Sequence, residues 1–104
     1  MNKLETPKMI KFNGVECTLA FAEYENGNTA ILLMEGGTRY AVATLNDPEL
    51  ELLEADQVLI KDYSENEGMV KALQEAGIVQ PLYPHPVGTF GANTWVCKLN
   101  TIEL

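Results

Sequence analysis

The stretch KDYSENEGM sets carboxylates, a hydroxyl, an amide and a glycine close together, and such a set could bind a cation. Asp62, Ser64 and Asn66 lie at alternate positions, as the first oxygen ligands of an EF-hand calcium loop do. That loop needs a glycine at its sixth position and a bidentate glutamate at its twelfth, where this sequence has Glu67 and Leu73. The pattern therefore does not predict a calcium site in this stretch.

A helix start explains the same stretch better. Ser64 and Glu67 have the spacing of a capping box, in which each side chain accepts the backbone N–H of the other residue. Apolar residues at helical spacing follow in MVKALQEAGI, and Gly77 stands where a helix commonly ends in a left-handed residue. We therefore predict an α-helix over about residues 65–76.

His85 and the two cysteines are the remaining reactive side chains. A catalytic or metal-binding histidine needs an orienting partner, and no cysteine or second histidine lies near His85 in the sequence. Cys17 and Cys97 are too few and too far apart for a disulfide scaffold or a zinc cluster. Cys97 alternates with apolar neighbours, so we expect both thiols to be buried and inert.

No known catalytic signature stands out in this sequence. It contains no GxSxG, glycine-rich phosphate loop or HExxH pattern, and nothing selects a general acid and base from its many carboxylates. We therefore expect no catalytic residue, cofactor or metal. The alternative is a small-molecule-binding domain or small enzyme with a pocket near Tyr83, His85 and Trp95, where aromatic residues cluster beside the histidine.

The charge of the chain is concentrated in one segment. The sequence has 15 acidic and 7 basic residues, a net charge of −8. Segment 47–67 contains eight acids and one base, Lys61, and therefore carries −7 of that charge. Direct binding of nucleic acids or anionic membranes normally uses clustered Lys and Arg, so we expect neither as a partner.

An acidic surface of this kind could instead bind a basic protein. The candidate partner-binding residues are Glu49, Glu51, Glu54, Asp56, Asp62 and Glu65. The plainer alternative is that these carboxylates are a solvated connector. We predict a non-enzymatic accessory domain that binds a protein through segment 47–67.

Length and composition indicate one globular domain over residues 1–104. A chain of 104 residues with 46% hydrophobic residues can bury a core without disulfides or metals. It has no apolar run near the roughly 18 residues of a membrane span, and its N-terminus lacks the apolar stretch of a signal peptide. We therefore expect a cytoplasmic protein.

The first half of the chain predicts an antiparallel β-meander. The dipeptides Asn13-Gly14, Asn26-Gly27 and Gly36-Gly37 separate apolar runs, which is the strongest short signal for two-residue hairpin turns. Four strands are expected, at about residues 8–12, 15–25, 28–35 and 38–45.

Two-residue turns also predict the faces of this sheet. One side should carry Ile10, Phe12, Val15, Cys17, Leu19 and Phe21, with Phe21 opposite Leu32 and Leu19 opposite Met34. The other should carry Ile31, Leu33, Tyr40 and Val42, with Leu33 opposite Tyr40 and Ile31 opposite Val42. Both faces are then apolar, so the rest of the chain, curvature into a partial barrel, or a second subunit of a homo-oligomer must cover the second one.

The second half adds a fifth strand at 57–62, the helix, and a last strand at 94–99. Three prolines in VQPLYPHPVGTFGAN predict an extended loop there, not a helix or a central strand. The stretch QPLYPHPVG could also dock onto a partner as a proline-rich segment. The expected fold class is α+β.

The stretch KDYSENEGMVKALQEAGIV resembles a family of small acidic bacterial proteins that form a domain of unknown function. Members are common in gut bacteria and are often carried on plasmids, conjugative elements or phages. They also begin with hairpins around an Asn-Gly turn and carry the KDYSENEGM signature. The similarity covers about residues 10–100. It implies no reaction, cofactor or catalytic residue, but it implies an accessory role, such as countering a host defence.

Overall fold

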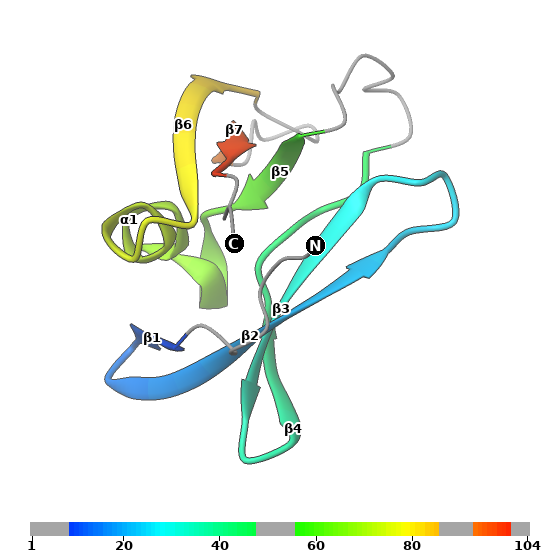
Figure 1. The fold of residues 1–104 in the computed structure, drawn as a ribbon. Helices are drawn as coiled ribbons and strands as arrows, with labels where there is room; N and C mark the ends of the chain where they lie inside the picture. Colours follow the sequence, from blue (N-terminus) through cyan, green and yellow to red (C-terminus); the bar gives the residue numbers. More distant parts are fainter. Residues whose placement is uncertain (1–8, 48–55, 86–92, 101–104) are drawn as a thin grey trace.

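The computed structural model describes residues 9–47, 56–85 and 93–100. These residues form seven β-strands, one α-helix and one short 3-10 helix (Figure 1). The elements are β1 (Met9–Phe12), β2 (Val15–Glu23), β3 (Thr29–Glu35), β4 (Thr38–Val42), β5 (Gln57–Lys61), η1 (Ser64–Asn66), α1 (Met69–Glu75), β6 (Val79–Pro84) and β7 (Thr94–Leu99). The predicted α+β class is confirmed.

The strands form two antiparallel sheets. The first has the order β1-β2-β3-β4, which is the predicted meander, and the second has the order β5-β7-β6. The second and fourth strands are shorter than predicted and end at Glu23 and Val42.

A short segment after β4 joins the two sheets. The N–H of Ala43 donates to the carbonyl of Ile31 in β3 at 2.8 Å. The carbonyl of Ala43 accepts the N–H of Lys61 in β5 at 2.9 Å, and the N–H of Leu45 donates to the carbonyl of Leu59 at 2.9 Å. Segment 43–45 therefore pairs with β3 on one side and β5 on the other, and the two sheets form one curled surface.

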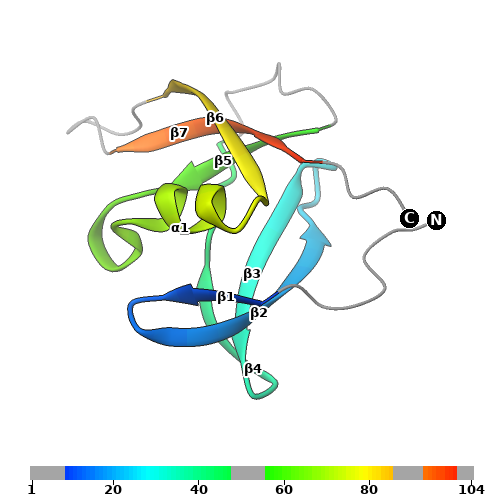
Figure 2. The same ribbon diagram turned by 60° about the vertical axis from the view of Figure 1, so that its left-hand side comes forward.

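The helix closes the open side of this curled surface. In Figure 2, α1 lies between β1 of the first sheet and β6 of the second. Its apolar face, Met69, Val70 and Leu73, is buried as predicted, and Ala76 packs against the same core. The core also contains Ile10, Phe12, Cys17, Leu19, Ile31, Leu33, Ala43, Val58, Ile60, Ile78, Val79 and Cys97. Curvature and the rest of the chain thus cover one face of the meander.

The first hairpin has the predicted turn and register. Phe12 pairs with Val15 across Asn13 and Gly14, whose φ angles are 54° and 77°. Positive φ at both turn residues is the requirement of a type I′ turn, which Asn-Gly satisfies with little strain.

The second turn is one residue longer than predicted. The N–H of Tyr24 donates to the carbonyl of Asn28 at 2.8 Å, and the N–H of Gly27 donates to the carbonyl of Tyr24 at 2.9 Å. The loop is therefore residues 25–27, ending on Gly27 with a φ of 91°. A type I turn followed by a left-handed residue is the usual three-residue hairpin loop.

The extra loop residue shifts the β2–β3 register by one position. The pairs are Leu19 with Leu33 and Phe21 with Ile31, in place of the predicted Met34 and Leu32. Because side chains alternate between faces, this shift exchanges the two faces of β3. Ile31 and Leu33 are 0% exposed in the core, and Leu32 and Met34 lie half-buried on the other face.

The third turn has the predicted two residues, because Glu35 pairs with Thr38. A bulge beyond it adds one residue to β4. The observed pairs are Leu33 with Ala41 and Leu32 with Val42, so the predicted pairs Leu33–Tyr40 and Ile31–Val42 are wrong. The second face of the meander holds Leu32, Met34 and Val42 instead of Ile31 and Leu33.

The proline-rich stretch forms a strand that the sequence did not predict. Val79–Pro84 is β6, an edge strand that pairs with β7, with a register shift between Pro81 and Tyr83. Proline lacks the N–H that a central strand needs, but an edge strand has only one neighbour to pair with. The exclusion of a central strand was correct, and the assignment of a loop to these residues was wrong.

The predicted capping box is absent from the helix start. The α-helix begins at Met69, after the η1 turn, and its N-cap is Gly68 with a φ of 92° and no side-chain cap. The carboxylate of Asp62 accepts the N–H of Gly68 at 2.5 Å. The helix end is as predicted, since Gly77 is left-handed with a φ of 78°.

Asn66 provides a specific link between η1 and the first sheet. The residue is 1% exposed, and its Nδ2 donates to the carbonyl of Val42 at 2.7 Å. Replacing Asn66 by Ala leaves that carbonyl without this donor, so we expect a loss of about 1–3 kcal/mol in the free energy of unfolding. The exposed amide Gln74, replaced by Ala, is the matched control and should change stability by less than about 0.5 kcal/mol. Equal effects in urea denaturation would contradict the assigned role of Asn66.

Candidate functional site

Two of the candidate partner-binding carboxylates, Glu65 and Asp62, form hydrogen bonds within this chain. Glu65 pairs with Lys61 at 2.7 Å, and this hydrogen bond is the main cause that lowers the pKa of Glu65 to about 2. Lys61 also lies over the ring of Tyr63, 5.2 Å from its centroid. Asp62 accepts the N–H of Gly68. Both carboxylates therefore organise the helix entry, and the exposed Glu65–Lys61 pair adds little stability of its own.

The structure describes one of the other four candidate carboxylates, Asp56, which is exposed just before β5. Glu67, an acid of the segment that was not a candidate, is exposed between η1 and α1. Glu49, Glu51 and Glu54 lie outside the described residues. Asp47 lies two residues after segment 43–45 and Asp56 directly precedes β5, so both are at described positions of the fold.

His85 has an orienting partner that the sequence did not reveal. Its Nε2 lies 3.2 Å from Oδ2 of Asp47, which is 38 residues away in the chain. Both side chains are partly buried, with exposed fractions of 31% and 22%. The backbone N–H of His85 donates to the carbonyl of Thr94 at 2.7 Å and so extends the β6–β7 ladder. A carboxylate on one ring nitrogen fixes the imidazole orientation and leaves the other nitrogen for a ligand.

The aromatic residues of the predicted pocket do not all share one face. Tyr83 pairs with Val96, and Pro84 with Trp95, so Tyr83 and Trp95 lie on opposite faces of the second sheet. Trp95 packs against the core, whereas Tyr83 is 48% exposed. Trp95 therefore cannot share one face of the sheet with Tyr83, and the contact that the structure shows for His85 is with Asp47.

The two cysteines are free and buried, as predicted. Burial raises the pKa of the Cys97 thiol to about 12, and the charge of Asp62 adds to the effect. Burial also raises the pKa of Cys17, with a contribution from Glu35. Because the thiolate is the nucleophilic form, neither side chain is set up as a nucleophile at neutral pH.

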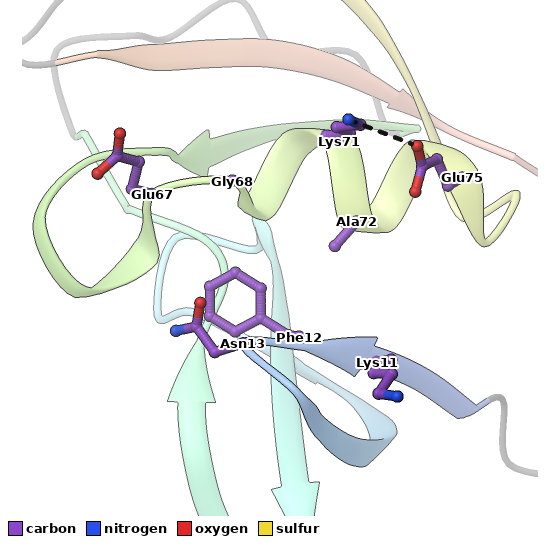
Figure 3. A pocket seen from close by; sticks show the side chains of 8 residues that line it. All are labelled: Lys11, Phe12, Asn13, Glu67, Gly68, Lys71, Ala72 and Glu75. Carbon is purple, nitrogen blue, oxygen red and sulfur yellow. Dashed lines mark ion pairs between the residues drawn. The ribbon is translucent and has the colours of Figure 1, made fainter.

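A cleft of about 250 Å³ lies between the first hairpin and the helix, in a place that the sequence did not predict (Figure 3). Its lining combines apolar and charged side chains. The residues are Lys11, Phe12, Asn13, Glu67, Gly68, Lys71, Ala72 and Glu75. No sequence signal could find it, because it depends on how α1 packs beside β1.

Direct indicators of function are few. Within residues 9–47, 56–85 and 93–100, no group of three or more His, Cys, Asp or Glu side chains is placed to hold a metal ion. Neither described helix is long and apolar enough to cross a bilayer. Comparisons of the chain with protein-family models, curated proteins and solved structures found no match.

Proposed function

We propose that this protein is a non-enzymatic accessory domain that binds a basic protein partner through the acidic segment 47–67. The observation that carries the proposal is an uncompensated local charge. The segment has eight carboxylates and one base. That base, Lys61, is paired with Glu65 at 2.7 Å, so it is not shared among the other carboxylates. Fields of one sign accelerate association with a partner of the opposite sign.

The frame around the segment supports this proposal. Asp47 contacts His85, and residues 57–61 of the segment form β5. A binding segment that is held by a rigid scaffold loses less conformational freedom when a partner binds.

The resemblance to small acidic proteins of mobile elements is consistent with such a role. It suggests a cytoplasmic accessory protein that modulates a host protein, with no direct contact to nucleic acid. Self-association through Leu32 and Met34, on the second face of the meander, is a separate prediction. Sedimentation would test it, since the particle should then weigh a multiple of 11.5 kDa.

The acidic-segment proposal predicts a position-specific loss of binding. Glu49, Glu51 and Glu54 are replaced together by Gln, and the immobilised protein is used to capture proteins from a bacterial lysate over a salt gradient. A salt-sensitive partner of the wild-type protein, once purified, should bind the triple variant about tenfold more weakly, because three attractive charges are removed.

The matched control removes three carboxylates elsewhere. Glu16, Glu23 and Glu25 are exposed on the first two hairpins, and their replacement by Gln changes the net charge equally. This variant should keep wild-type affinity. Equal losses in the two variants, or the absence of a salt-sensitive partner, would contradict the proposal.

The His85–Asp47 pair favours a second candidate, a small-molecule site that includes Tyr83. The motivating observation is the 3.2 Å contact that orients the imidazole of His85, two residues after the exposed Tyr83. A thermal-shift screen with metabolites and metal salts should then find a ligand that raises Tm of the wild-type protein.

That shift should disappear in His85→Ala and persist in Gln80→Ala, a change of an exposed residue in β6, the strand that His85 follows. A screen in which no compound shifts Tm, or a shift unchanged by His85→Ala, would remove this candidate.

A further inference from the structure

The strand β1 has a free edge. Among the described strands it pairs with β2 alone. Its two-residue turn makes Phe12 and Val15 a hydrogen-bonded pair, and such pairs alternate along an antiparallel ladder. The Lys11–Glu16 pair is therefore a non-hydrogen-bonded one. The N–H and carbonyl of Lys11 consequently point away from β2, where another strand could use them.

The 250 Å³ cleft lies along this edge, with α1 as its opposite wall. Figure 3 shows Phe12 on the strand and Ala72 on the helix directed into the space between the two elements. Phe12 is only 4% exposed and closes the base of the cleft, while the half-buried Ala72 adds apolar surface close to the unpaired backbone groups of Lys11. An exposed strand edge beside a helix is a geometry in which domains bind extended peptides by strand addition.

The charges at the rim of the cleft restrict what it can accept. Lys71 and Glu75 form an exposed pair at 4.0 Å, so they largely compensate each other. Lys11 and Glu67 are both exposed, and within the described part of the chain neither forms an ion pair. The rim therefore presents an exposed positive charge on the strand, with Glu16 as its cross-strand neighbour, and an exposed negative charge at the helix entry.

We propose that this cleft binds an extended peptide segment of a partner protein, which adds to β1 as a further strand. The peptide places a carboxylate side chain beside Lys11, a small apolar side chain over Phe12 and Ala72, and a basic side chain toward Glu67. Backbone hydrogen bonds to Lys11 supply affinity, and the alternating side chains supply specificity.

Charge disfavours a second copy of this chain as the occupant. Antiparallel pairing of two β1 edges centred on Lys11 would set the lysines of the two copies opposite each other, and like charges in that position are destabilising. Each copy also carries a net charge of −8. A peptide with one acid and one base meets neither penalty. The proposal is independent of segment 47–67 except for Glu67.

The test begins with a display library of random nine-residue peptides, selected on the immobilised wild-type protein and resynthesised individually. Selected peptides should share an acidic residue to face Lys11, a small apolar residue to face Phe12 and Ala72, and a basic residue to face Glu67. In the wild-type protein, saturating peptide should slow hydrogen exchange of the Lys11 amide by about tenfold or more, because that N–H becomes hydrogen-bonded.

Substitutions at one position separate backbone from side-chain recognition. Lys11→Pro removes the outward N–H together with the ammonium group and should weaken peptide binding by about tenfold or more, so its excess over Lys11→Ala measures the backbone contribution. Lys11→Ala keeps the N–H and should weaken it about two- to fivefold, because an exposed ion pair is lost. Arg39→Ala, on the opposite edge strand β4, removes an exposed cation elsewhere and should leave peptide affinity unchanged.

Exchanging the charges of Lys11 and of the peptide's acidic residue should restore binding, which a variant that is only destabilised could not do. Lys11→Glu should prefer a peptide in which the acidic residue is replaced by Lys. The proposal is overturned if no peptide is selected, if the Lys11 amide of the wild-type protein exchanges equally fast with and without peptide, or if charge exchange fails to restore binding. Loss of peptide binding in the Glu49, Glu51 and Glu54 triple variant would show that the peptides recognise the acidic segment instead, and would also overturn it.

Discussion

The fold depends on three residues, 43–45, that hydrogen-bond to both sheets at once. Ala43 donates to Ile31 in β3 and accepts from Lys61 in β5. Thr44, which is 4% exposed, accepts the N–H of Ile31 through its hydroxyl oxygen and contacts the hydroxyl of Tyr24 at 2.9 Å. Buried backbone groups must be paired, so this segment fixes how the sheets meet. Without it, each sheet would leave one apolar face uncovered.

The two candidate interaction surfaces follow from this joint. The acidic segment starts two residues after segment 43–45 and contains β5, which hydrogen-bonds to segment 43–45, so its described parts rest on the same hydrogen-bonded frame. The joint also brings β5 and β6 over the first sheet, and α1 then packs beside β1 and forms the cleft around Phe12 and Ala72. One surface is charged and the other is a narrow groove, so they suit partners of different chemistry.

The sequence correctly predicted the features that depend on residues close together in the chain, such as a tight turn and a helix end. Asn13 and Gly14 determine the first hairpin because both must adopt positive φ, and Gly77 ends the helix for a related reason. The dipeptide Asn26-Gly27 is compatible with a two-residue or a three-residue loop. The structure has the three-residue loop, in which the side chain of Asn28 donates to that of Asn46. The Asp47–His85 contact was invisible for another reason: pairs 38 residues apart depend on the packing of the sheets.

Native-state hydrogen exchange tests most directly whether segment 43–45 makes the two sheets one cooperative unit. The amides of Ala43, Leu45 and Lys61 should exchange only through global unfolding, with the same free energy and the same denaturant dependence as the core amides of β3 and β7. If the β5-β7-β6 amides instead exchange at a clearly lower free energy while β2 and β3 remain protected, the sheets unfold separately and this account of the fold is contradicted.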